Sequence, residues 1–246
     1  MSEFTKTLIV DSSLQNPVYP YYNSIKKAAQ YFINHVPPIG GVIIVERGTY
    51  TFDEEDDYPT NNNWRTTVYI PSNVTIIGRG NAVIEVNNNV PVFKNADQSG
   101  GNERITISGF KIVVKFGDEK FSKNVIDLKA VTKCVIEKMY ITYDQTKTNG
   151  VHYENAAIAI WGSLSPERYS RDTIIRQCSV VDYGKLKPAD GKNNCGMSVL
   201  IHTKCERNLT KFTQFLRKPC HNRNSGSISP STAKRPRDMS TIPCVG

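Results

Sequence analysis

The sequence predicts an all-β solenoid, a fold built from stacked coils, because short apolar segments recur along the chain. The segment "CVIEKMYI" (134–141) aligns with "ITISGFKI" (105–112) and with "TIIRQCSV" (173–180), at offsets of 29 and 39 residues. Three sets of apolar side chains coincide in this alignment: Ile107 with Ile136 and Ile175, Phe110 with Met139 and Cys178, and Ile112 with Ile141 and Val180.

A second segment recurs in phase with the first. "NVIDLK" (124–129) returns as "AAIAIW" (156–161) and as "MSVLIH" (197–202), and "VTIIGRGNAVIEV" (74–86) is a looser, earlier copy of the first repeat. A period near 30 residues made of short β-branched runs is typical of solenoids. We therefore expect short strands that stack on one another, with apolar columns inside and polar corners outside.

Residues 23–36, "NSIKKAAQYFINHV", carry the clearest helical pattern in the chain. Their apolar residues recur at the three- and four-residue spacing of a single helix face. Asn23 or Ser24 can cap the start of the helix, and Pro37-Pro38 ends it. Because the first coil of a solenoid has an open edge, we expect this helix to cover that edge.

The segment "GGVIIVERGTYTF" (40–52) predicts a buried strand, a tight turn and a second short strand. Gly48 stands where the turn would need a backbone angle that other residues resist. The next segment, "DEEDDYPTNNNW" (53–64), is acidic and polar and is expected to be a solvated loop. Two insertions, at 144–156 and 162–172, lengthen the later repeat, and insertions of this kind commonly form binding surfaces.

The distribution of charge divides the chain at residue 202. The formal net charge is +8, but residues 203–246 hold nine of the 31 Lys and Arg residues and only two of the 23 Asp and Glu residues. The same segment has few β-branched aliphatic residues, so it has little apolar surface to bury. We expect one solenoid domain over 1–202 and a basic tail over 203–246. This tail is either disordered or, after a truncation or frame shift of the gene, not native to the fold.

Composition also argues against several classes of protein. The body is close to neutral and gives no electrostatic argument for nucleic acid as a partner. No signal peptide is visible at the N-terminus, and no apolar stretch approaches the length of a membrane span. The six cysteines form no CxxC pair, so a zinc site is not expected. Cys134 and Cys178 fall within the apolar repeat, where a thiol acts as a small buried hydrophobe.

The order of these elements resembles the right-handed parallel β-helix superfamily, which includes pectate lyases, polygalacturonases, pectin methylesterases and many phage tailspikes. The most specific part is 22–86, where the helix is followed by "GGVIIVERGTY" and "NVTIIGRG". The coils of 87–202 extend the resemblance. It implies a right-handed parallel β-helix with an N-terminal capping α-helix. It implies no single chemistry, because this fold hosts many activities.

One face of the expected coils carries the candidate binding residues. If the three copies of the second repeat stack in register, their outward positions form two columns. The columns are Asp127, Ala159, Leu200 and Lys129, Trp161, His202. We expect Trp161 to face solvent as a platform for a sugar ring, with Lys129 and His202 placed to meet a carboxylate or a hydroxyl. The alternative is that the following insertion covers Trp161 and that His202 is an ordinary corner residue.

The resemblance also implies where catalytic groups would lie, because enzymes of this superfamily place carboxylates or an Arg on adjacent coils of that face. The candidates are Asp127, Asp182 and Arg171, and nearby alternatives are Asp172, Glu154 and Arg176. None of them stands in a recognised family motif, and Asp127 has no acidic partner directly above it. We predict no metal ligands and no cofactor, although calcium would be consistent with the pectate lyases of the superfamily.

Two classes of function follow from these observations. The first is a carbohydrate-active, pectate-lyase-like protein, complete or truncated, that cleaves or modifies an acidic polysaccharide as a lyase or a glycoside hydrolase. The second is a non-catalytic β-helix that binds glycans or serves as a spike or structural module. A polysaccharide is the expected partner, and the sequence leaves a homo-oligomer open. An extracellular location follows only from the resemblance.

Overall fold

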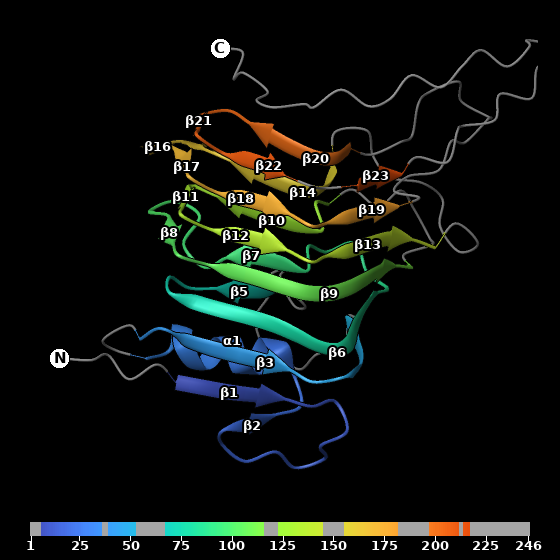
Figure 1. Cartoon of the computed structure of the whole chain (residues 1–246). Coiled ribbons are helices and arrows are strands. Elements are labelled where there is room, and N and C mark those ends of the chain that lie inside the picture. The colour runs from blue at the N-terminus through green and yellow to red at the C-terminus, as the bar shows by residue number, and fades with distance from the viewer. Residues whose placement is uncertain are drawn as a thin grey trace, which may run out of the picture.

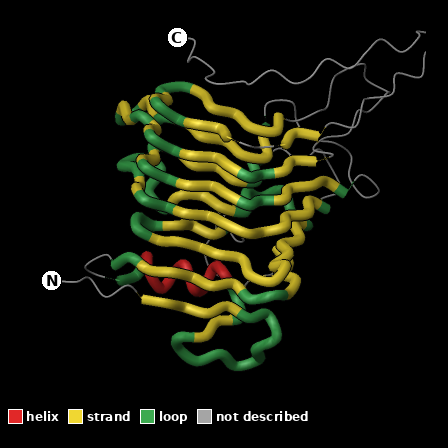
Figure 2. Tube along the Cα trace, in the orientation of Figure 1, coloured by secondary structure: helices red, strands yellow, loops and turns green. Residues whose placement is uncertain are grey.

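The computed structural model of the 246-residue chain has mostly β structure, and the part that it describes contains one α-helix (Figures 1 and 2). The expectation of parallel β architecture is confirmed, because all the long-range strand pairs are parallel. The structure describes residues 6–35, 39–52, 67–115, 123–144, 155–181, 197–211 and 214–216.

The largest sheet, sheet A, runs the full height of the molecule in Figure 1. A second row of strands continues the same sheet along its length and includes β4, which pairs with the far half of β6. In spatial order the main row is β2 (Tyr21–Tyr22), β1 (Lys6–Val10), β3 (Gly41–Val45), β6 (Val74–Val86), β9 (Thr106–Val114), β12 (Val135–Glu137), β18 (Ile174–Arg176) and β22 (Leu209–Lys211). The second row is β4 (Gly48–Phe52), β13 (Tyr140–Tyr143), β19 (Ser179–Val181) and β23 (Gln214–Leu216).

Two narrower sheets complete the stack. The chain passes from sheet B to sheet C and then to sheet A, and it returns to sheet B one strand further along. Sheet B contains β5 (Val68–Ile70), β7 (Phe93–Asn95), β10 (Ile126–Lys129), β14 (Ala156–Trp161) and β20 (Met197–His202). Sheet C contains β8 (Asn102–Glu103), β11 (Val131–Thr132), β17 (Ser170–Arg171) and β21 (Cys205–Glu206). Between β14 and β17, β15 (Ser163–Leu164) and β16 (Glu167–Arg168) form an antiparallel hairpin.

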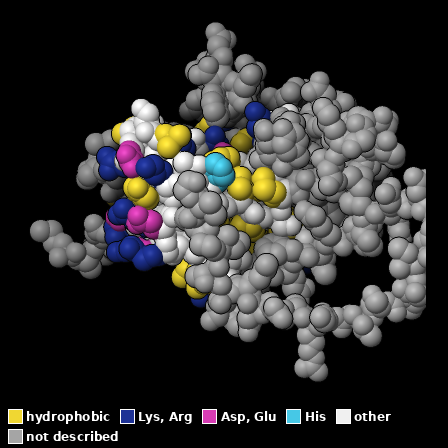
Figure 3. Space-filling view, turned by 90° about the horizontal axis from the view of Figure 1, so that it is seen from above, with side chains coloured by type: hydrophobic (Ala, Val, Ile, Leu, Met, Phe, Trp, Pro, Cys, Tyr) yellow, Lys and Arg dark blue, Asp and Glu magenta, His cyan; other side chains and the backbone are white. Residues whose placement is uncertain are grey.

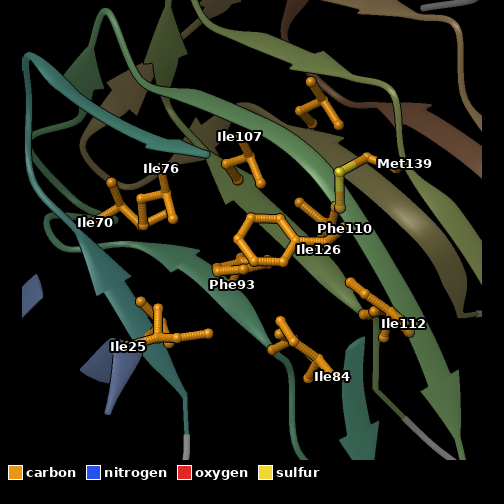
Figure 4. Close-up of a cluster of buried hydrophobic side chains, with 14 of the residues drawn as sticks. Ile25, Ile70, Ile76, Ile84, Phe93, Ile107, Phe110, Ile112, Ile126 and Met139 are labelled. Atoms are coloured by element: carbon orange, nitrogen blue, oxygen red, sulfur yellow. The ribbon is translucent and has the colours of Figure 1, made fainter. Parts of the chain in front are cut away.

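The core is made of aligned apolar columns, as the repeats predict. Ile136 pairs with Ile107 on one side and with Ile175 on the other, and all three are buried. The same column continues through Ile76 and Ile43. Figure 4 shows how side chains from sheets A and B meet in the interior, where the rings of Phe93 and Phe110 lie 5.4 Å apart. Each fully buried aliphatic side chain contributes roughly 1.5–3 kcal/mol of transfer free energy.

The helix forms where the apolar pattern predicts it, and it is shorter than expected. It is α1 (Ile25–Ile33), with Ser24 as the N-cap residue, although the Ser24 side chain makes no capping hydrogen bond. Its buried face packs against β5, β3 and β1. α1 therefore covers the end of sheet B beside β5. This position agrees with the expectation that the helix covers the first edge, and sheet A extends past the helix through β1 and β2.

Gly48 avoids a close contact with Ser12, and it does not supply the left-handed backbone that the turn is expected to need. The expected strand–turn–strand is present as β3 and β4, but Gly48 is not among the residues with a left-handed backbone. A Cβ atom at this position would lie 2.6 Å from Ser12 Oγ. This contact is with the rotatable end of the Ser12 side chain, so glycine leaves room for that hydroxyl where the segment after β1 passes the start of β4.

Paired strands continue beyond residue 202, the position where the sequence predicts that the stacked strands end. β21, β22 and β23 each pair in parallel with the strand of the preceding pass. Thr210 stands opposite Ile175, so a hydroxyl residue replaces the isoleucine of the column. This substitution explains why the apolar period fades in the sequence while the strand persists.

Several expectations fall on residues that lie outside the described part of the chain. They concern the acidic segment 53–64, most of the insertion 144–156, and the basic residues 217–246. Within the described ranges, no helix combines the length and apolar character needed to cross a membrane.

Candidate functional site

The outward face of sheet B brings the three expected binding residues together. Lys129 pairs with Trp161, and Trp161 pairs with His202, so the predicted column is confirmed as a structural feature. The Trp161 and His202 rings lie 5.4 Å apart and are inclined at 60°. Lys129 and Trp161 are half-buried, whereas His202 is exposed and contacts the Thr203 hydroxyl through Nδ1.

The indole of Trp161 is not a fully open platform. Its ring is partly covered, and its Nε1 atom is buried and has no hydrogen-bond partner among the residues that the structure describes. A buried donor left without an acceptor costs about 1–3 kcal/mol.

The neighbouring column contains a charged cluster, Tyr69, Lys94 and Asp127, of which the sequence identifies only Asp127 as a candidate. Tyr69 of β5 pairs with Lys94 of β7, and Lys94 pairs with Asp127 of β10. The Lys94 ammonium lies 3.6 Å from Asp127 Oδ2, and Asn124 Nδ2 donates to Asp127 Oδ1 at 3.3 Å. Lys94 is only 6% exposed, and Ala159, the next residue of the column, is fully buried. This part of the face is therefore covered rather than bare.

The electrostatics of this cluster follow from its burial. Burial lowers the pKa of Lys94, the charge of Asp127 opposes that shift, and the charges of Lys123 and Lys129 add to it. Burial also raises the pKa of Tyr69 to about 12, and the charge of Asp127 adds to the shift. The cluster thus holds one carboxyl group and three lysines, an excess of basic groups.

Arg171 and Asp127, two of the expected catalytic residues, lie on different sheets. Asp127 belongs to sheet B, whereas Arg171 belongs to sheet C and its Nε lies 2.9 Å from Glu206 Oε2. The third candidate, Asp182, lies outside the described residues, as does the alternative Glu154. The structure therefore does not bring Arg171 to the face that holds Asp127.

The remaining alternatives are engaged in exposed ion pairs. Asp172 accepts hydrogen bonds from Arg207 at 2.6 and 2.9 Å, and this contact lowers the pKa of the Asp172 carboxyl. Arg176 Nε donates to Glu137 Oε2 at 2.7 Å. Both pairs link neighbouring passes of the chain. Among the residues that the structure describes, no three His, Cys, Asp or Glu side chains gather as a metal site would require.

The cysteines in the repeat behave as small hydrophobic residues. Cys134 and Cys178 are buried and free, as the sequence predicts. Burial raises the pKa of the Cys134 thiol to about 11 and also raises that of Cys178. Both thiols are therefore protonated at neutral pH, which makes them poor nucleophiles.

Comparison with known proteins gives no family. No family model matches the sequence, and no curated protein matches it. Among solved structures, ORF18 of Geobacillus virus E2 is similar at 16% sequence identity with a TM-score of 0.31. The match covers 76% of this chain and 46% of the viral chain, so this chain spans less than half the length of that protein.

Proposed function

We propose that the chain is a right-handed parallel β-helix that binds an acidic polysaccharide on the outward face of sheet B. The parallel pairing supports this fold, as does the repeated order of sheets B, C and A. Connections between parallel strands of one sheet are right-handed in nearly all proteins, which supports the handedness. The first pass begins at β5, and α1 packs against its edge.

The observation that carries the binding proposal is the Lys129–Trp161–His202 column beside the Lys94–Asp127 pair. Adjacent strands are ~4.8 Å apart, so the column forms a continuous strip across three strands. A sugar ring presents C–H groups that pack on an indole face, and its carboxylate suits the positive charge of the lysines.

The proposal is tested by binding of defined polysaccharides to the full chain. Isothermal titration with polygalacturonate and with its methyl-esterified form compares the same backbone with and without charge. The acidic form should bind at least tenfold more tightly, and the difference should shrink as salt rises, because exposed ion pairs are screened. Equal affinity for both forms, or no binding of either, would refute the proposal.

A second candidate function is cleavage of the bound chain. The observation that favours it is the buried Lys94, whose pKa is lowered and which lies against the Asp127 carboxylate. To remove the proton next to a uronate carboxyl, the first step of lyase chemistry, Lys94 must first lose its own proton and the side chains that cover it must move aside. Ultraviolet absorbance detects the unsaturated ends that a lyase releases. Binding with no new ends, unsaturated or reducing, would identify a non-catalytic module.

A further inference from the structure

A groove of about 390 Å³ lies over sheet C, away from the column on sheet B. Its floor is formed by outward residues of three consecutive strands, Glu103 of β8, Thr132 of β11 and Arg171 of β17. One wall is β16, the second strand of the β15–β16 hairpin, with the residue that follows it, Tyr169. Figure 3 shows that basic and acidic side chains gather together at the edge of the molecule where Figure 1 places β16, β17 and β21.

The wall opposite the hairpin is a loop that its own hydrogen bonds hold in place. Asp97 Oδ1 accepts from the backbone N–H groups of Ser99 at 3.0 Å and Gly100 at 2.6 Å. Gly101 has a φ of +90°, and a Cβ atom there would lie 2.3 Å from the Ala130 carbonyl oxygen. Only glycine fits this position. The wall therefore has its shape without any ligand.

The hairpin wall carries an aromatic ring fixed by charged neighbours. The Arg171 guanidinium lies 4.9 Å from the centre of the Tyr169 ring, and the Lys204 ammonium lies 5.4 Å from it. Lys204 also donates to Glu167 Oε1 at 2.6 Å, which lowers the pKa of Glu167 and keeps this carboxylate ionised. Glu206 Oε2 lies 2.9 Å from Arg171 Nε. The ring and the charged groups are thus oriented in advance of binding.

We propose that this groove is a second saccharide-binding site and that it takes a neutral, hydroxyl-rich chain. Among its lining residues the charges balance, with Glu103 and Glu167 against Arg168 and Arg171. Three of these four groups are already in ion pairs, Glu103 with Arg104, Glu167 with Lys204 and Arg171 with Glu206, so neither an anion nor a cation gains a net attraction. A hydroxyl can donate to a carboxylate and accept from a guanidinium, so sugar hydroxyls satisfy both. The assignment does not depend on the acidic polysaccharide proposed for sheet B, because the two sites share no side chain.

The test is titration of the full chain with neutral hexasaccharides of glucose, xylose and mannose, with oligogalacturonate as the acidic comparison. We expect one neutral hexasaccharide to bind, and Tyr169→Ala and Glu103→Gln each to weaken it by at least tenfold. Glu103→Gln keeps the size of the side chain and provides a readout if Tyr169→Ala does not fold. Tyr140→Ala is the matched control, because Tyr140 is an exposed tyrosine on sheet A with a lysine, Lys111, near its ring.

The outcomes separate the two sites. Trp161→Ala should leave the neutral saccharide unaffected while weakening oligogalacturonate, and Tyr169→Ala should do the reverse. The groove assignment is overturned if no neutral hexasaccharide binds at millimolar concentration, or if binding is unchanged in both groove variants. Loss of oligogalacturonate binding in Tyr169→Ala would likewise overturn it, because the groove would then belong to the acidic ligand.

Discussion

The Trp161 indole lies one strand from the His202 imidazole on sheet B, with ring centres 5.4 Å apart and an angle of 60° between their planes. This inclined arrangement leaves the two rings as separate surfaces rather than a closed stack. A flat ligand can therefore meet one ring face while its polar edge reaches the other. The lysine on the other side of Trp161, Lys129, adds a positive charge to the same strip.

Replacement of Trp161 tests whether this strip binds sugar. Trp161→Ala should weaken binding of an acidic polysaccharide by roughly 1–3 kcal/mol, the usual scale for a large aromatic contact. The melting temperature should change little, because the ring is only half-buried and its N–H lacks a partner. Calorimetry and thermal melting measure the two effects. Trp161→Phe serves as the matched variant, since it keeps a ring but removes the donor. A large fall in melting temperature with unchanged binding would make Trp161 a packing residue.

The raised pKa of Tyr69 predicts a loss of stability at high pH. In the unfolded chain a tyrosine ionises near pH 10, whereas Tyr69 in the fold remains protonated until about pH 12. Between these values the unfolded state loses the proton first, so rising pH favours unfolding. The contribution is about 1–2 kcal/mol after an allowance for solvent screening. Urea unfolding from pH 9 to pH 12 measures it.

Two variants isolate this effect from other tyrosines. Tyr69→Phe cannot ionise and should flatten this part of the pH profile. Asp127→Asn removes the second cause of the shift and should reduce the slope by a smaller amount. An unchanged profile in Tyr69→Phe would show that Tyr69 does not contribute.

The buried isoleucine column predicts that replacing Ile136 by alanine lowers the stability of the fold substantially. Ile136 is fully buried between Ile107 and Ile175, so Ile136→Ala should lower the free energy of unfolding by about 2–5 kcal/mol. Val135→Ala, one residue away on the opposite face, should cost much less because Val135 is only partly buried. Urea denaturation of both variants gives the comparison. Equal costs would contradict the inward and outward assignment.

Two hydrogen bonds of the Asn208 side chain predict that the segment after residue 202 stabilises the fold. Its Oδ1 accepts from the Thr173 backbone N–H at 2.9 Å, and its Nδ2 donates to the Ser170 carbonyl at 3.1 Å. Asn208→Ala leaves both backbone groups without this partner and should cost about 1–3 kcal/mol. Thermal melting measures the loss. A neutral result, alongside a neutral Leu209→Ala control at an exposed site, would mean that this segment is not docked.

The parts of the fold with a visible period could be predicted, and they include part of the site. The isoleucine columns and the Lys129–Trp161–His202 register follow from alternation and from the spacing of the repeats. Tyr69 and Lys94 were missed because their strands are three residues long and give too little alternation to detect. A lysine followed by an asparagine, as in Lys94-Asn95, also resembles a solvated position.

The misplacement of Arg171 has a different cause. The insertion before it contains a hairpin, and the sequence does not reveal how many residues that hairpin uses before the chain rejoins a sheet. The chain reaches sheet C at Ser170–Arg171, so Arg171 lies beside Thr132 and Glu206. The strand at Lys6–Val10 was missed because a five-residue segment ahead of the helix shows no repeat.

Because strands pair with those of the preceding and following passes, the chain can fold progressively. In the described ranges, the strands that follow the first one of each sheet mostly pair with a strand about 25 to 41 residues earlier in the chain, so a partner is already present when they form. Folding can proceed strand by strand from the N-terminal end during synthesis on the ribosome. Damage to one strand then stalls growth at that point and leaves the earlier strands intact.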